Sequence, residues 1–179
     1  MQVDEFYHPD RRQYFITADD AEKASLDSGV DAGWVRTGES FKAYAAGSRA
    51  AGSVNPVCRY YGNGSDTRGP ASHLYSADVG ECLDMHRLSV DFPDPFDRGF
   101  FRHRFYWQYE SDNVFQIDLP DRTTGACSEG TAPVYRLWNR QGDSSNRYTT
   151  RAAIKAEMLA AGYVAEGYGP DGVVMCAVQ

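Results

Sequence analysis

The sequence predicts a mainly β fold with short helices, built from three pseudo-symmetric repeats. Three stretches of the chain follow one order of strand-forming, turn-forming and helix-forming residues. Such repetition is typical of folds that are assembled from copies of one small unit. The chain also contains 12 Tyr and 9 Phe, which favour cross-strand packing, and 17 Gly, which suit the turns between short strands. We expect an arrangement like that of a β-trefoil.

The repeats cover residues 3–47, 56–118 and 133–176 of a single domain, 1–179. Each begins with a short aromatic strand, at residues 6–7, 60–61 and 137–138. A polar turn rich in Asn, Asp, Gly or Pro follows. A second strand of β-branched and aromatic residues comes next, at 14–17, 73–76 and 147–149. Each repeat therefore opens with a predicted β-hairpin.

A short helix follows each hairpin. Thr17 or Asp19 is a suitable N-cap for a helix over 21–29, and Ser76 or Asp78 for one over 79–87. In the third repeat the helix covers 151–162, with Ile154, Met158 and Leu159 expected on one buried face. Gly29 and Gly162 suit the ends of the first and third helices. An aromatic residue, Trp34, Trp107 or Tyr163, then opens the last strand, and core packing is the favoured role for these three rings.

Two segments interrupt the pattern. Residues 43–55 are rich in small side chains and are predicted to form a linker between the first two repeats. Residues 91–105 are an insertion with two Pro, three Arg and five Phe. This insertion is interpreted first as a surface loop and alternatively as part of a binding face.

Composition excludes several classes of function. A net charge of −7 and a pI near 5.0 disfavour binding to nucleic acid, which requires a basic face. No apolar stretch approaches the roughly 20 residues that cross a bilayer, so we expect no membrane insertion. We expect a secreted, extracellular and monomeric protein, with Met1 standing where a signal peptide has been removed.

The four cysteines predict two disulfides. None lies in a CxxC pair or has a His at zinc-finger spacing, which argues against a zinc site. Three pairings are possible. We favour Cys58 with Cys82, which closes the second repeat, and Cys127 with Cys176, which ties the start of the third repeat to the end of the chain. Disulfides indicate an oxidising compartment.

The repeats resemble a tandem repeat family of uncharacterised function from extracellular bacterial and some fungal proteins. Its pattern is Y-R-F-Y-N, then H-F-Y-T-T and a short helix, then G-W-x-x-E-G. The matching stretches here are PVYRLWN and NRYTTR in repeat three, PVCRYYGN and SHLYSAD in repeat two, and FYHPDRRQYFITAD in repeat one. The resemblance implies three copies of one unit in a protein that accompanies secreted hydrolases or surface proteins. His73 alone keeps the His of the pattern, and Thr37 replaces the Glu that is Glu110 and Glu166 elsewhere.

The motifs of common enzymes are missing from the sequence. There is no G-x-S-x-G elbow, no HExxH helix and no P-loop. Ser72 and His73 are neighbours on a predicted strand, so their side chains point to opposite faces and cannot form a dyad. The four histidines are far apart in sequence. We therefore expect a protein that is not an enzyme and has no catalytic residue, no metal site and no cofactor.

Carbohydrate recognition is the favoured function. Sugars stack their CH faces on aromatic rings and hydrogen-bond through planar polar groups, and each repeat has both kinds of residue. The candidates are Trp138, Asn139, Asn146, Tyr148 and Glu166 in repeat three, Tyr61, Asn63, His73, Tyr75 and Glu110 in repeat two, and Tyr7 and His8 in repeat one. A glycan or another cell-surface ligand is thus the expected partner. The alternative is a protein-binding adhesion or accessory module attached to a secreted enzyme or surface protein.

Overall fold

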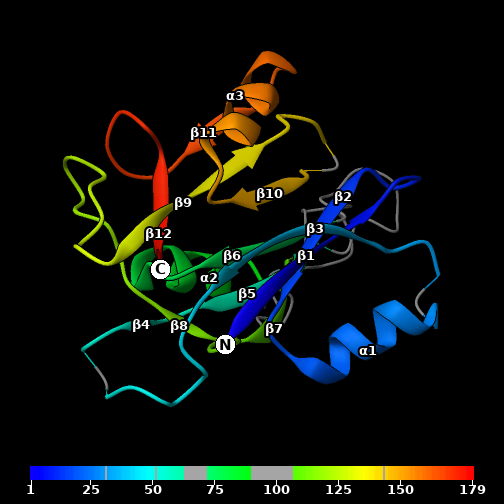
Figure 1. Cartoon of the computed structure of the whole chain (residues 1–179), viewed down its shortest axis with the longest axis horizontal. Helices are drawn as coiled ribbons and strands as arrows, with labels where there is room; N and C mark the ends of the chain where they lie inside the picture. Colours follow the sequence, from blue (N-terminus) through cyan, green and yellow to red (C-terminus); the bar gives the residue numbers. More distant parts are fainter. Residues whose placement is uncertain (31, 51, 63–71, 90–106, 143) are drawn as a thin grey trace, which may run out of the picture.

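The computed structural model describes residues 1–30, 32–50, 52–62, 72–89, 107–142 and 144–179. Within them, short antiparallel strands dominate and three helices occur (Figure 1). Segment one comprises β1 (Gln2–His8), β2 (Gln13–Thr17), α1 (Asp20–Ser28) and β3 (Val35–Lys42). Segment two comprises β5 (Cys58–Gly62), β6 (His73–Ser76), α2 (Val79–Arg87) and β7 (Trp107–Ser111). Segment three comprises β9 (Thr131–Trp138), β10 (Asn146–Thr149), α3 (Ala152–Ala160), β11 (Val164–Glu166) and β12 (Val173–Val178). The prediction of a mainly β fold with short helices is confirmed.

The strands form three sheets. Segments one and three share a seven-stranded sheet with the order β10-β9-β12-β3-β1-β2, in which β11 pairs with β9. Segment two forms its own sheet, β6-β5-β7. Two short strands, β4 (Asn55–Pro56) and β8 (Gln116–Ile117), pair separately. Figure 1 shows α1 beside the strands of segment one and α3 beside those of segment three. Helix α2 contacts β6 and β7, so each helix contacts strands of its own segment.

The opening hairpins of the three segments pair in the same register. Glu5 lies opposite Ile16, Arg59 opposite Tyr75, and Arg136 opposite Tyr148. In every segment the helix begins three residues after the end of the second strand. Positions of the three segments can therefore be compared one by one.

Aspartates cap the first two helices. Asp19 accepts hydrogen bonds from the backbone N–H groups of Ala21 and Glu22, and Asp78 accepts one from that of Glu81. Helix α3 follows Arg151, which makes no side-chain cap bond. The sequence prediction was wrong for Leu159, which is 42% exposed. Ile154 and Met158 are separated by four positions and share the buried face, whereas position 159 is turned away by about 100°.

The segment predicted as a linker is packed at both ends. Tyr44 exchanges two backbone hydrogen bonds of 2.9 Å with Gln116 of β8, and Ala43 and Val54 are buried. The linker prediction was therefore wrong for these ends, because backbone pairing with a later strand cannot be inferred from small side chains. The predicted insertion at 91–105 lies wholly outside the described residues.

Two tyrosines join the three segments at the centre of the core. The hydroxyl of Tyr75 donates to the carbonyl oxygen of Ile16 at 2.7 Å. The hydroxyl of Tyr148 donates to the carbonyl oxygen of Tyr75 at 2.9 Å and accepts from its N–H at 2.8 Å. Both side chains are buried, and burial raises the pKa of Tyr148 to about 12. Tyr75 and Tyr148 are thus core residues that hold the segments together.

Substitution of Tyr148 by Phe should destabilise the fold by about 1–3 kcal/mol, because it leaves the buried N–H and C=O of Tyr75 without these partners. Urea unfolding followed by tyrosine and tryptophan fluorescence measures the change. The control is Tyr7→Phe, because the Tyr7 side chain is half-buried and stacks on Tyr14 at 4.7 Å. Equal unfolding midpoints for Tyr148→Phe and the unchanged protein would contradict the role of this hydroxyl.

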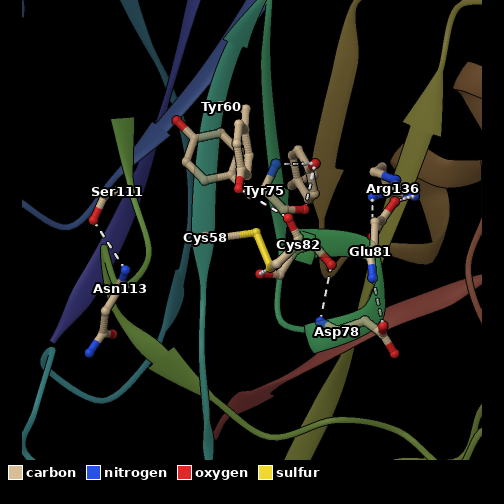
Figure 2. The surroundings of a disulfide bond; sticks show 11 residues. Cys58, Tyr60, Tyr75, Asp78, Glu81, Cys82, Ser111, Asn113 and Arg136 are labelled. Atoms are coloured by element: carbon tan, nitrogen blue, oxygen red, sulfur yellow. Dashed lines mark hydrogen bonds and ion pairs between the residues drawn. A yellow bond between two sulfur atoms is a disulfide. The ribbon is translucent and has the colours of Figure 1, made fainter. Parts of the chain in front are cut away.

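Two disulfides link elements that are separated in the sequence. Cys58 of β5 is bonded to Cys82 of α2, and Figure 2 shows this bond holding the helix against the strand. Cys127 is bonded to Cys176 of β12. Both pairings predicted from the sequence are confirmed, and all four cysteines are used.

Candidate functional site

An open pocket lies between segments one and two. Its volume is about 540 Å³, which is in the range of small-molecule sites. One wall comes from α1 and the residues around it, and the opposite wall comes from the strands of segment two. The lining residues are Phe15, Ala21, Glu22, Ser25, Leu26, Trp34, Arg59, His73 and Glu110. We call this the first pocket.

Arg59 holds the two walls of the first pocket together. Its Nη2 and Nη1 lie 2.7 and 2.9 Å from the two carboxylate oxygens of Glu22 on α1. Its Nε lies 2.7 Å from Oε2 of Glu110 on β7. The Arg59 side chain is only 14% exposed, so these charged contacts are well shielded from water. One guanidinium thus joins a helix of segment one to a strand of segment two.

Two groups of this cluster, Glu110 and Arg59, have pKa values shifted in the direction that favours their charged forms. Burial acts to raise the pKa of Glu110, but His73 and the Arg59 guanidinium outweigh it, and the net effect lowers that pKa. Burial acts to lower the pKa of Arg59, and the bonds to Glu22 more than reverse this effect. His73 adds a ring nitrogen 3.4 Å from the same Glu110 oxygen. The pocket therefore offers carboxylate acceptors beside a ring nitrogen and a guanidinium.

Aromatic rings form the apolar side of the first pocket. The rings of Phe15 and Trp34 are 5.9 Å apart, and Phe15 also contacts the His73 ring edge-on at 4.6 Å. The buried imidazole of His8 meets the indole of Trp34 at right angles, 5.4 Å away. Gly33 permits this packing, since it has a φ of +97° and a Cβ there would lie 2.5 Å from His8 Nε2. The half-buried indole of Trp34 is thereby held at the pocket wall.

A second pocket of about 460 Å³ lies between segments two and three. It is lined by Ser76, Asp78, Gly80, Glu81, Asp84, Met85, Arg136, Gly167, Tyr168 and Val174. Arg136 is 8% exposed and contacts both carboxylate oxygens of Glu81 at 2.7 and 3.1 Å. Figure 2 shows this pair, with Glu81 of α2 facing Arg136. The Nε of Arg136 lies 3.0 Å from Glu166 of β11.

Two of the predicted site residues, His73 and Glu110, lie together in the first pocket. Tyr61 is next to them, with its ring 4.8 Å from the His73 ring. His8 lies behind Trp34, where its imidazole supports the indole. Glu166 contacts Arg136, which lines the second pocket. Tyr75 and Tyr148 are in the core, as described above.

The other candidates lie elsewhere. Trp138 and Asn146 are paired at the end of the β9–β10 hairpin, and the amide of Asn146 donates to the carbonyl oxygen of Ser144. Asn139 stabilises the turn by accepting the N–H of Gln141 at 3.1 Å. Tyr7 stacks on Tyr14, and Asn63 lies outside the described residues. The structure therefore brings Tyr61, His73 and Glu110 of repeat two together, whereas the candidates of repeat three are spread over the hairpin end, the core and the second pocket.

The arginines of the two pockets and the helix glutamates were not among the site residues predicted from the sequence. Arg59 and Arg136 occupy the same position of the first strand, and Glu22 and Glu81 the same position of the helix. The stretches ADDAE and ADVGE contain these glutamates, so the repetition itself held the signal. It was missed because charged residues at a helix start are usually solvated. Trp34, for which core packing was favoured from the sequence, is half-buried: it packs against the core and also lines the first pocket.

No cofactor site emerges from the side chains of the described residues. Among them, no group of three or more His, Cys, Asp or Glu is arranged to hold a metal ion. None of the described helices combines the length and the apolar character needed to cross a membrane. Each of the two pockets combines carboxylates, a guanidinium and apolar side chains in an open cavity, a lining that can contact both polar and apolar parts of a ligand.

These features define a β-rich, disulfide-linked domain with open surface pockets between its segments. The chain belongs to a family described as a domain of unknown function, DUF5648, whose model matches residues 1–87 and 103–172. No curated protein and no solved structure matches the chain significantly. The family thus agrees with the resemblance to proteins of uncharacterised function, and it assigns no activity.

Proposed function

We propose that this protein is a non-catalytic binding module that recognises carbohydrate in the first pocket. The observation that carries the proposal is the pairing of an aromatic wall, Trp34 and Phe15, with the polar cluster of Arg59, Glu110 and His73 in one open cavity. A pyranose ring stacks its CH groups on an indole and directs its hydroxyls to carboxylate and ring-nitrogen partners. The cavity has room for one or two sugar residues.

The ligand we propose carries no negative charge. The charged side chains that line the first pocket are one guanidinium and two carboxylates, and the guanidinium is engaged by both carboxylates. An acidic sugar would find no free cation among these residues and would meet an excess of negative charge. Neutral and amino sugars are therefore favoured over uronic or sialic acids.

The proposal includes three pseudo-symmetric repeats around a common axis. It is supported by the equal hairpin registers, by the arginines at matching positions, and by the tyrosine hydrogen bonds that lead from segment three to segment two and on to segment one. Secretion is proposed with it, because two disulfides suit an oxidising compartment.

A glycan array followed by titration calorimetry tests the function. We expect binding to neutral or amino glycans, and we expect Trp34→Ala to weaken it by about tenfold or more, which corresponds to about 1.4 kcal/mol. The matched control is Trp138→Ala, which removes another half-buried indole that does not line either pocket. Silence across the array, or a loss with Trp138→Ala in place of Trp34→Ala, would refute the site.

A protein-binding role is the second candidate. It is favoured by three exposed apolar side chains on and after α2, namely Val79, Leu83 and Leu88, each more than half exposed. Val79 and Leu83 are four positions apart and share one helix face. If a protein partner binds this face, Leu83→Asp abolishes its capture while Trp34→Ala has no effect.

A further inference from the structure

We infer that the second pocket is a second binding site of the same class, which takes a positively charged amino-sugar residue. The inference rests on the proposed function and extends it to another part of the molecule. The second pocket is nearly as large as the first pocket, and like the first it lies between a helix of one segment and strands of the next.

The two pockets are built at matching positions. In each, a largely buried arginine of a first strand contacts a glutamate of the preceding segment's helix and a glutamate of its own segment's later strand. These contacts are Arg59 with Glu22 and Glu110, and Arg136 with Glu81 and Glu166. The helix walls also correspond, since Ala21, Ser25 and Leu26 in the first pocket match Gly80, Asp84 and Met85 in the second. The second cavity therefore repeats the plan of the first.

The differences between the walls determine the ligand. Ser25 of the first pocket is replaced by Asp84, and Asp78 also lines the second pocket. Arg136 is already engaged by two glutamates. Within the described ranges, Asp78 pairs with Arg122 and Asp84 with Arg87, and these arginine side chains are 67% and 74% exposed and largely screened by water. A ligand with a protonated amine fits this excess of negative charge.

The second pocket also has a surface on which a sugar ring can pack. Tyr168 donates its hydroxyl to the carboxylate of Asp78, and this bond fixes the phenol ring at the pocket wall. The buried side chain of Met85 supplies further apolar contact. A glucosamine residue can therefore place its ring on these groups and its ammonium among the carboxylates.

The contact between segments three and one is built differently from the two that form the pockets. The position of Arg59 and Arg136 is occupied by Glu5, and the position of Glu22 and Glu81 by Ile154. Arg147 reaches Glu5 from β10 at 2.9 Å and covers the ring of Tyr14. The cavity that Glu5 lines has a volume of about 10 Å³, enough for one water molecule at most. We therefore expect two sites per chain.

Three tryptophan substitutions at one helix position test the inference. Ala21, Gly80 and Ala153 occupy matching exposed positions of α1, α2 and α3, and the first two line the pockets. The probe is the trimer of β-1,4-linked glucosamine, with cellotriose as the same chain without amines. Native mass spectrometry counts the bound probe, and calorimetry measures the affinity.

We expect two glucosamine trimers per unchanged chain, one for Ala21→Trp, one for Gly80→Trp, and two for Ala153→Trp. In Ala21→Trp, where only the second pocket is free, glucosamine trimer should bind about tenfold or more tightly than cellotriose. Asp84→Trp blocks the same wall and replaces Gly80→Trp if that variant does not fold.

The outcomes separate the two proposals. One trimer per chain, lost in Ala21→Trp and kept in Gly80→Trp, would overturn the second site and leave the proposed function intact. The reverse pattern would keep the second site and refute the first. Equal affinity for cellotriose in Ala21→Trp would overturn the amino-sugar assignment, and binding that none of the variants changes would refute both sites.

Discussion

Substitution of Arg147 by Met is expected to destabilise the fold by about 3–5 kcal/mol, the usual cost of leaving a buried charge without its partner. The Glu5 side chain is 2% exposed, and both of its carboxylate oxygens lie 2.9–3.0 Å from nitrogens of Arg147. Without Arg147, Thr37 remains as a hydrogen-bond donor to Glu5 at 2.8 Å. A hydroxyl satisfies one lone pair but does not neutralise the charge, so the penalty persists.

A second substitution isolates the electrostatic part of this loss. Glu5→Gln in the Arg147→Met background removes the orphaned charge, and we expect the double variant to be more stable than Arg147→Met alone. Guanidinium unfolding curves of the four proteins give the coupling energy. The control is Arg151→Met, whose partner is Glu39 and whose own side chain is 60% exposed; it should cost less than about 1 kcal/mol. Additive effects of Glu5→Gln and Arg147→Met would show that the pair does not interact.

Removal of the Cys127–Cys176 disulfide is expected to cost about 4 kcal/mol, because the bond closes 49 residues of chain and restricts the unfolded state. The double variant Cys127→Ala/Cys176→Ala should therefore melt about 10 °C below the unchanged protein. Cys176 is fully buried in the hydrophobic cluster around Leu137 and Ile154, and alanine leaves no unsatisfied polar group there. Differential scanning calorimetry without reductant measures the difference.

The other disulfide provides the comparison. Cys58 and Cys82 are separated by 24 residues, so Cys58→Ala/Cys82→Ala should cost about 3 kcal/mol, slightly less than the first pair. Reduction of the unchanged protein should lower its melting temperature at least as far as the larger of the two losses. A melting temperature that dithiothreitol does not move would contradict the stabilising role of both bonds.

Short-range patterns made much of the fold predictable. The β-branched and aromatic residues of Tyr14–Thr17 and His73–Ser76 favour strands through local preference alone, and both strands are present. For each of the first two helices the sequence offered two candidate caps, Thr17 or Asp19 and Ser76 or Asp78, because a cap bonds to N–H groups only two or three residues away. The structure uses the aspartates. The disulfide pairing could also be proposed from the sequence, since four cysteines allow only three connectivities.

The candidate site was predicted only in part, because its contacts span long distances in sequence. His73 and Glu110 were identified, and they lie in the first pocket. Asn146 was chosen for its position near a turn, yet its amide is used by the backbone of its own hairpin. Nothing local to Arg59 indicates that its partner is Glu22, which is 37 residues away on another segment's helix.

The sequence by itself determined the main strands and the helix of each segment and their order, because these depend on neighbouring residues, and it reduced the cysteine pairing to three alternatives. Only the tertiary structure decided which rings are buried and which line a cavity. Tyr75 and Tyr148 are internal because their hydroxyls satisfy backbone groups of adjacent segments. Trp34 lines a pocket because that pocket lies between the helix of its own segment and the strands of segment two. Burial is set by the sum of packing around a side chain, and residues distant in the chain supply most of that packing.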